Sequence, residues 1–343
     1  MASENAPGRR PSMFDVARLA GVSHQTVSRV LNDSPAVAEA TRRRVADAIA
    51  AVGYRRNQAA RQLATARSRI IGLITPRTSL YGPSRSTLAI EAAARERGYW
   101  VSLVSLPQAT AQAMADALGH FLELAVDAVA VIAPNPAVLH ALAAAPDLPP
   151  AVAVTSGPAL PGVTVADADQ ALGARLATER LIGLGRRRIA HIAGPADFYH
   201  ARVRAEVWAR TLAEHGLAAD RQADGDWSGP SGRAAAAQLL AAGSPAPDAI
   251  FAGNDLMAMG AIAAVKRAGL KVPDDVAVVG FDDVPGADVA DPPLTTVDPD
   301  HGSLGRAVVE LLDRRLNAGD AAWSGTAASA ALAPPRLVVR ESA

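Results

Sequence analysis

The chain has 343 residues and no net charge, with 50% hydrophobic but only 4% aromatic residues, so we expect more than one domain and a mainly aliphatic core. It contains no cysteine, which excludes disulfides, thiol nucleophiles and cysteine-ligated metals. The first residues lack the apolar core of a signal peptide and no apolar run is long enough to span a membrane, so a cytoplasmic protein is expected.

The positive charges gather at the front of the chain. Residues 1–69 contain 12 arginines and five acidic residues, whereas the whole chain has 34 residues of each sign. The rest of the chain is therefore net acidic. A solvated charged surface is the plain alternative, but combined with the helix pair of residues 13–34 a basic segment favours nucleic-acid binding.

Residues 13–34, MFDVARLAGVSHQTVSRVLNDS, combine two short helical patterns around one glycine. The apolar positions expected to face each other are Val16, Leu19 and Ala20 on the first helix and Val27, Val30 and Leu31 on the second. Gly21 supplies the turn, and Ser23 can cap the second helix. A third helix over residues 41–52 is expected to bury Val45, Ile49 and Val52, with the arginines at 42–44 facing solvent or phosphate. This pattern predicts a helix-turn-helix, which presents the start of its second helix to the major groove.

From residue 69 onward, short apolar runs alternate with helical stretches. The expected strands are residues 69–75, 100–106, 126–134, 149–156, 187–194, 248–255, 275–283 and about 336–341. The expected helices are residues 87–98, 111–124, 169–184, about 203–215, one that ends at 268, and 303–316. Such alternation is typical of parallel sheets buried on both faces, and it predicts two successive α/β subdomains.

Ligands of open parallel sheets lie beyond the carboxyl ends of the strands. Small or polar residues stand at these ends, at positions 75–84, 134–135, 155–156, 194–195, 254–255 and 282–283. They fit a crevice for a polar small molecule. Asn and Asp between a strand and a helix are also ordinary N-caps, and position alone leaves both interpretations open.

Two N-terminal segments resemble the DNA-binding head of the lactose-repressor (LacI) family. They are DVARLAGVSHQTVSRVLN and TRRRVADAIAAVGYRRNQAARQLA. The likeness continues through GPSRSTLAI, ARVRAEVW, GDWSGPSG, AGNDLMAMGA and VVGFDDVPGADVADPPLTTV. It implies an N-terminal all-α helix-turn-helix head plus a hinge helix, and an α/β body of two Rossmann-like parallel-sheet subdomains, like that of periplasmic binding proteins. The implied bounds are 1–56 for the head, 57–68 for the hinge and 69–343 for the body, whose first subdomain covers about 69–168 and 300–325 and whose second covers about 169–297 and 328–340.

The resemblance also implies the DNA contacts. His24, Gln25 and Arg29 are expected to face bases. The other implied contacts, most of them to phosphates, are Ser12, Ser23, Thr26, Ser28, Asn32, Thr41, Tyr54 and Asn57. In the hinge helix, Ala60 is expected to allow close approach of two copies, and Leu63 to wedge between base pairs in the minor groove. A lone leucine in a short helix is otherwise a core residue.

For the body, the resemblance implies an effector pocket. Its expected residues are Leu80, Pro83, Ser84, Arg204, Trp227, Asn254, Asp282 and His301. Arg204 and Asp282 can form charge-assisted hydrogen bonds with hydroxyls, although Arg204 could equally be a surface charge. Val154, Pro299 and His301 depart from the family pattern, so a ligand other than a simple galactoside is expected.

These observations predict a homodimeric repressor whose affinity for double-stranded operator DNA is relieved by a small carbohydrate. A heptad helix that joins dimers in the family's namesake has no counterpart here, so a dimer is the expected assembly. The alternatives are a regulator activated by a corepressor, as in purine-responsive members, and a sugar receptor without a DNA function. No enzyme, cofactor or metal site is expected, because known nucleotide and metal motifs are missing and the neighbouring Asp282 and Asp283 should point to opposite faces.

Overall fold

The computed structural model describes residues 11–31, 34–54, 67–76, 80–145, 148–242, 245–318 and 331–343. It divides into two compact units, Met1–Ser68 and Arg69–Ala343. Every helix among the described residues is too short or too polar to cross a membrane.

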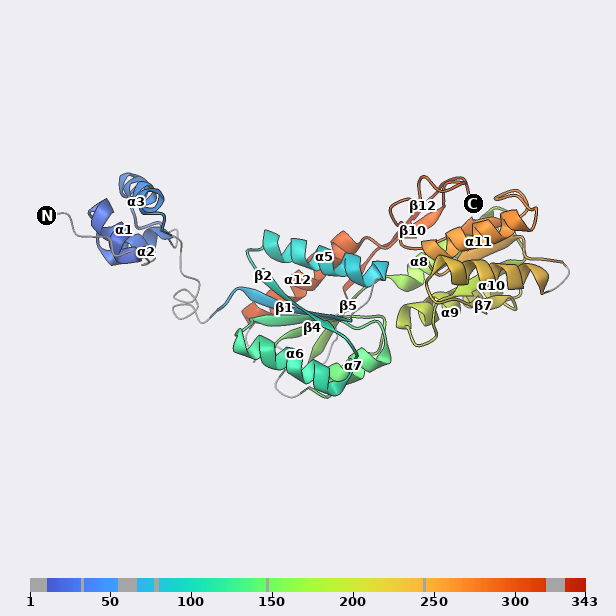
Figure 1. The fold of residues 1–343 in the computed structure, drawn as a ribbon, viewed down its shortest axis with the longest axis horizontal. Helices are drawn as coiled ribbons and strands as arrows, with labels where there is room; N and C mark the ends of the chain where they lie inside the picture. Colours follow the sequence, from blue (N-terminus) through green and yellow to red (C-terminus); the bar gives the residue numbers. More distant parts are fainter. Residues whose placement is uncertain are drawn as a thin grey trace. The chain divides into compact units, whose positions relative to one another are not determined.

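The described residues of the N-terminal unit form three helices, α1 (Met13–Ala20), α2 (His24–Leu31) and α3 (Glu39–Val52), which are the blue helices of Figure 1. Gly21 ends α1 in the left-handed conformation, with φ 64°, which a glycine adopts without steric penalty. Ser23 caps α2, because its hydroxyl accepts a hydrogen bond from the Thr26 N–H at 3.1 Å. The expected helix-turn-helix is confirmed.

The core of this unit differs from the expectation in two helices: in α3, Val45 is buried with Ala48, whereas Ile49 and Val52 are only half-buried, and α1 differs at Leu19. Val16, Val27 and Val45 are completely buried, one from each helix. Leu19 is 57% exposed, so the prediction that it faces α2 is wrong. Ala17 is buried in its place, because the buried stripe of α1 runs along the other flank of Val16.

The second unit has two lobes. The sheet of the first lobe is entirely parallel, and its strands lie side by side in the order β11 (Ala331–Ala333), β5 (Val163–Ala168), β4 (Ala151–Val154), β3 (Ala128–Ile132), β1 (Ile70–Pro76) and β2 (Trp100–Leu106). Helices α5 (Tyr81–Glu96) and α12 (His301–Ala318) cover one face, and α6 (Ala111–Glu123) and α7 (Pro136–Ala143) cover the other (Figure 1). The strands are apolar along most of their length because both faces are covered.

The sheet of the second lobe is also parallel, in the order β7 (Gln222–Asp224), β6 (Ile189–Ala193), β8 (Ala249–Ala252) and β9 (Ala277–Val279). Its two faces are covered by α8 (Gln170–Gly183) with α9 (Tyr199–Glu214), and by α10 (Gly229–Ala241) with α11 (Asp255–Arg267). A short antiparallel pair, β10 (Thr296–Asp298) and β12 (Arg336–Val338), lies beside them. The predicted pair of parallel-sheet subdomains is confirmed.

The chain passes between the lobes at three places: from β5 to α8, from β10 to α12, and from β11 to β12. The first passage lies between residues 168 and 170 and the second between residues 298 and 301. Before the third passage, β11 pairs with β5 of the first lobe, whereas residues 328–340 were expected in the second. Strand β11 has only three residues, all small or apolar, so its sequence shows no period that would predict a strand. Its partner strand, β5, also lies far away in the sequence.

Helix α5 begins at Tyr81, six residues before the expected start at 87. Gly82 and Pro83 are typical of a loop, but proline is well tolerated in the first turn of a helix, where its missing N–H has no partner to lose. This extension places Tyr81, Gly82, Pro83 and Ser86 beside the cleft between the lobes.

Candidate functional site

Two adjoining cavities lie between the lobes, at the carboxyl ends of their strands. The outer chamber is lined by Leu80, Tyr81, Gly82, Pro83, Pro134, Phe198, His200, Arg204, Trp227, Asn254 and Asp282. The more enclosed inner chamber is lined by Gly82, Pro83, Ser86, Ile132, Val154, Asp167, Ala168, Gln170, His200, Arg204, Asp282, Pro299, His301 and Leu304. The chambers share Gly82, Pro83, His200, Arg204 and Asp282 in their linings, so they adjoin each other, and both touch the two lobes.

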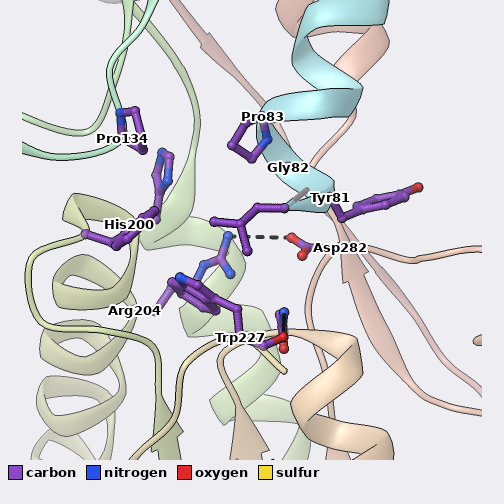
Figure 2. Close-up of a pocket in the computed structure, with 11 residues that line it drawn as sticks. Tyr81, Gly82, Pro83, Pro134, His200, Arg204, Trp227 and Asp282 are labelled. Carbon is purple, nitrogen blue, oxygen red and sulfur yellow. Dashed lines mark hydrogen bonds and ion pairs between the residues drawn. The ribbon is translucent and has the colours of Figure 1, made fainter. Parts of the chain in front are cut away.

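Arg204 lies at the centre of this site on α9, and its side chain is buried. Its guanidinium donates to the side-chain oxygen of Gln170 at 2.7 and 2.9 Å and to the carbonyl oxygen of Gly253. It also lies over the ring of Phe281, 3.6 Å from the ring centre. These contacts hold a buried cation in one orientation, with Asp282 Oδ1 at 3.7 Å from its Nη2 (Figure 2).

Asp282 carries the acceptor group of the site. Its side chain is 10% exposed, and burial raises the pKa of its carboxyl to about 6 although Arg204 opposes this shift. The residue has a φ of 107°, a region that side chains other than glycine rarely adopt. Such strain is typical of positions that hold a functional group in place. The next residue, Asp283, forms an ion pair with Arg340 at 2.8 Å, so the two carboxylates point to different partners.

Trp227 forms an aromatic wall of the outer chamber. Its ring packs edge-on against Phe198, with 5.8 Å between ring centres, and closely against Gly194. A Cβ atom at Gly194 would overlap the indole ring, so the position requires glycine. The indole Nε1 is buried and has no hydrogen-bond partner among the described residues, which leaves a donor for a ligand.

Asn254 is both the N-cap of helix α11 and a lining residue of the outer chamber. Its Oδ1 accepts from the N–H of Met257 at 2.9 Å and caps α11, while its Nδ2 donates to the carbonyl oxygen of Trp227 at 3.0 Å. Because the amide carries two N–H groups, one can still be offered to a ligand. Asn254 therefore links the helix end to the aromatic wall.

Of the residues expected in the pocket, the structure brings Leu80, Pro83, Arg204, Trp227, Asn254, Asp282 and His301 to the two chambers. Ser84 lies apart from them. It is exposed within α5, and its hydroxyl donates to the carbonyl oxygen of Leu80 at 2.9 Å. Its expected role in bridging the lobes has no support in this geometry, because the start of α5 turns its side chain away from both chambers.

Several lining residues were not anticipated. Phe198 and His200 lie at the start of α9, in a segment where the expected helix began only at 203. Asp167 and Gln170 follow from β5, a strand that the sequence pattern did not reveal. The sequence could have indicated Pro134, since it follows β3 and belongs to the strand-end positions where a ligand was expected.

The exposed face of α2 carries the side chains expected to read bases. Gln25 and Arg29 are both exposed and lie one helical turn apart, so they share a face. His24 stacks on Phe14, with 4.7 Å between ring centres. Ser12 hydrogen-bonds with Asp15 at the start of α1, and Ser28, Thr41 and Tyr54 are half-buried. Asn32, Asn57, Ala60 and Leu63, and with them the expected hinge helix, lie outside the described residues.

Arg42 differs from the expectation that it faces solvent or phosphate. Its guanidinium donates to the carbonyl oxygen of Ser34 at 3.0 Å, and its side chain is 29% exposed. It therefore fixes the segment between α2 and α3. Arg43 is 77% exposed and better placed to meet a phosphate.

Comparison with known proteins gives the chain its family. Residues 12–57 match the model for bacterial regulatory proteins of the lacI family, and residues 178–343 match a periplasmic binding protein-like domain. The chain is 34% identical over 304 residues to the lactose operon repressor of Escherichia coli (strain K12), covering 88% of this chain and 83% of that protein. The chain belongs to the lacI family of bacterial regulatory proteins. It is a DNA-binding transcriptional regulator.

Solved structures of relatives agree with this assignment to the lacI family. The dimer of the Lac repressor bound to operator and the anti-inducer ONPF has a TM-score of 0.80 and 31% identity, and the match covers 97% of this chain and 99% of that one. The complex of the transcriptional regulator CelR with cellobiose has a TM-score of 0.71 and 32% identity, covering 97% and 100%. The described residues hold no group of three histidine or acidic side chains that could bind a metal ion.

Proposed function

We propose that this lacI-family regulator is a repressor that binds a pseudo-palindromic operator as a homodimer and releases it when a carbohydrate binds between the lobes. The observation that carries the proposal is the pairing of an aromatic wall, Trp227, with the charged pair Arg204 and Asp282 in one cleft. Sugars offer C–H faces to aromatic rings and hydroxyls to charged groups. Relatives whose names refer to lactose and cellobiose favour the same ligand class.

The DNA-binding role rests on the basic helix-turn-helix. Gln25 and Arg29 are proposed to read base edges, together with His24. The proposed phosphate and backbone contacts are Ser12, Ser23, Thr26, Ser28, Asn32, Thr41, Tyr54 and Asn57. Two copies of the segment 57–65 are proposed to fold together in the minor groove, where Ala60 permits close approach and Leu63 kinks the duplex.

An apolar surface on the first lobe supports the homodimer. Trp100 and Leu103 are 66% and 53% exposed on the edge strand β2, and Leu88 is 58% exposed on the neighbouring helix α5. Trp100 and Leu103 point to opposite faces of this strand, so they favour a protein partner that covers the edge of the sheet. A second copy of the chain is the partner proposed here, as in the operator-bound dimer of the Lac repressor. Light scattering should give a dimer at micromolar concentration, and Trp100→Glu should shift it to monomers.

The position of the ligand between the lobes couples sugar binding by the body to operator binding by the N-terminal unit. A sugar that touches Pro83 of the first lobe and Arg204 and Asp282 of the second binds the closed body better than the open one. It can shift the equilibrium only by this difference in affinity. By linkage, an effector that weakens operator binding tenfold must itself bind tenfold more weakly to the operator complex, a coupling of about 1.4 kcal/mol.

We assign the regulator to the cytoplasm, where its operator lies, and we assign it no catalytic activity. Both proposals rest on the lacI-family relationship. Ser86 lines the inner chamber, with its hydroxyl 3.2 Å from Nδ1 of His301, but no carboxylate among the described residues hydrogen-bonds to the other ring nitrogen to complete a catalytic triad.

The proposal is tested with the full chain and an operator selected from random duplexes. Fluorescence anisotropy measures operator affinity at several salt concentrations, with and without a panel of sugars. We expect affinity to fall steeply with salt and to fall at least tenfold with one sugar. If a ligand makes operator binding tighter, the ligand is a corepressor and not an inducer that releases the operator. Absence of salt-dependent binding to any selected duplex would overturn the DNA-binding role.

A further inference from the structure

The inner chamber contains polar groups that are buried and only partly hydrogen-bonded. His301 begins α12, and its Nδ1 lies 3.2 Å from the hydroxyl of Ser86 on α5. Its other ring nitrogen, Nε2, is buried and makes no hydrogen bond to any described residue. Burial lowers the pKa of His301 to about 4, so the ring is neutral at pH 7. The ring can then donate or accept one more hydrogen bond from a ligand.

Asp167 and His200 form a second polar pair in the same chamber. Asp167 Oδ1 lies 3.5 Å from His200 Nε2, which makes no hydrogen bond within the described part of the chain. Asp167 Oδ2 accepts from the hydroxyl of Ser156. A ligand hydroxyl placed beside this pair can donate to the carboxylate and hydrogen-bond with the imidazole at once.

An apolar group is a poor occupant for such a chamber. It would leave the two imidazole nitrogens without a hydrogen-bond partner and would offer no donor to the carboxylate of Asp167. An anion is also disfavoured, because two carboxylates, Asp167 and Asp282, face one arginine, Arg204, among the described residues that line the chamber. A neutral, hydroxylated group satisfies the lining best.

The inner chamber adjoins the part of the cleft proposed to hold a sugar ring. Arg204 and Asp282 line both chambers, and so do Gly82 and Pro83 of the first lobe. A ligand with one ring beside Trp227 therefore passes the charged pair and enters the inner chamber with its other end. Val154, Pro299 and Leu304 offer that end flat apolar contacts between the polar groups.

We propose that the inner chamber binds a second hydroxylated ring, held by His301, His200 and Asp167, so that the effector is a disaccharide. The preferred ligand is then neither a monosaccharide nor a glycoside whose second group is apolar. This inference rests on the carbohydrate effector proposed for the repressor and specifies it further.

Calorimetry on the full chain tests the proposal with three matched sets of ligands. Each set contains a monosaccharide, a disaccharide and a nitrophenyl glycoside: glucose, cellobiose and nitrophenyl β-glucoside; galactose, lactose and nitrophenyl β-galactoside; glucose, maltose and nitrophenyl α-glucoside. We expect the tightest ligand to be a disaccharide that binds at least tenfold more tightly than both other members of its set.

The outcomes separate the two proposals. If a monosaccharide or a nitrophenyl glycoside binds as tightly as its disaccharide, the carbohydrate effector stands and the role of the inner chamber is overturned. If no member of any set binds, the carbohydrate effector fails, and the disaccharide proposal fails with it.

Variants of His301 locate the second ring. His301→Phe should weaken disaccharide binding about tenfold while leaving the nitrophenyl glycoside of the same set unchanged or tighter, and His301→Gln should restore most of the loss. His140, which is exposed on α7, gives the matched control, because His140→Phe should change none of the affinities. If His301→Phe fails to fold, Ser86→Ala removes the partner of the imidazole and should weaken only the disaccharide, by about threefold. Equal losses for all members of a set would contradict the proposal.

Discussion

Thr296 donates a hydrogen bond from its hydroxyl to the carboxyl group of Asp255, and both residues are completely buried. The other oxygen of Asp255 accepts from the N–H of Val284 at 2.8 Å. Asp255 thus ties the start of α11 to β10, which leads into the first lobe, and to the loop that carries Asp282. Burial, together with the nearby charge of Asp282, raises the pKa of Asp255 to about 8.

This raised pKa makes stability depend on pH. Between the unfolded value near 4 and the folded value near 8, the folded state binds more protons, so the contribution of Asp255 to stability is largest at low pH and is lost as pH rises towards 8. Asp255→Asn removes this dependence, because the amide oxygen can accept from Val284 while the hydroxyl of Thr296 turns to accept from the amide N–H. We expect the melting temperature of the variant, relative to the native chain, to rise steadily between pH 5 and pH 8.

Taking the difference in melting temperature between the variant and the native chain cancels the contributions of the other titrating groups, because both proteins contain them. His191 is fully buried with a pKa lowered to about 4, so its own contribution to stability is lost below about pH 6.5 in both proteins. A difference in melting temperature that stays constant from pH 5 to pH 8 would show that Asp255 is already ionised in the fold.

Effector binding should depend on the protonation of Asp282. The ionised carboxylate accepts stronger, charge-assisted hydrogen bonds from ligand hydroxyls than the protonated carboxyl does, and its pKa is raised to about 6. Affinity for the tightest sugar should therefore be constant above pH 7 and fall by up to tenfold per pH unit below about pH 6. Asp282→Asn should bind weakly at every pH and abolish the response to the sugar, with little change in operator affinity without the sugar. Calorimetric titrations at pH 5, 6, 7 and 8 measure this, and a native protein with pH-independent affinity would contradict it.

Gly194→Ala should damage the site without unfolding the lobe. The added methyl group would overlap the indole of Trp227, which must move out of the outer chamber. We expect at least a tenfold loss of sugar affinity, measured by calorimetry, with operator binding retained. Gly119 in α6 is the matched control, because a methyl group there meets no atom within 4 Å and Gly119→Ala should raise stability by about 0.5–1 kcal/mol. Native affinity in the Gly194 variant would show that Trp227 is not a wall of the ligand site.

Contacts of the N-terminal helix-turn-helix with DNA bases and with phosphates can be tested separately. Gln25→Ala should cost about 1–3 kcal/mol at one operator position and relax specificity there. Arg43→Ala should weaken all sequences alike and lower the salt dependence of binding. Arg43 replaces Arg42 as the phosphate probe, because Arg42 holds the carbonyl oxygen of Ser34 and its loss would disturb the fold. Titrations against operators with single-base changes decide the matter, and an unchanged ranking for Gln25→Ala would show that α2 does not read bases.

Much of the fold followed from hydrophobic patterning, and its omissions have physical causes. Strongly apolar strands such as β1, β3 and β8 were found, because burial on both faces demands continuous apolar runs. The strands β5, β7, β10 and β11 and the helices α7 and α10 were missed. Strands of three residues show no period, and α10 begins with Gly229 and Pro230, which resemble a loop.

The site was predicted less completely than the fold. Resemblance to a family supplied Arg204, Trp227 and Asp282, since those residues stand within recognisable segments of sequence. The inner chamber could not be derived, because Asp167 lies on an unrecognised strand and meets His200 only across the cleft. Ser84 was misplaced for a related reason, since its direction depends on where α5 begins.

The three passages between the lobes also constrain how the protein could exchange parts with its relatives. Strand β11 completes the first lobe and is encoded after nearly all of the second, so no single recombination event can replace one lobe as an intact piece. The head and the body are joined by one segment at Ser68 and Arg69, and a single event there moves either unit whole. Operator preference is therefore easy to exchange between genes, whereas a new effector preference has to arise through substitutions within the lobes or by replacement of the entire body.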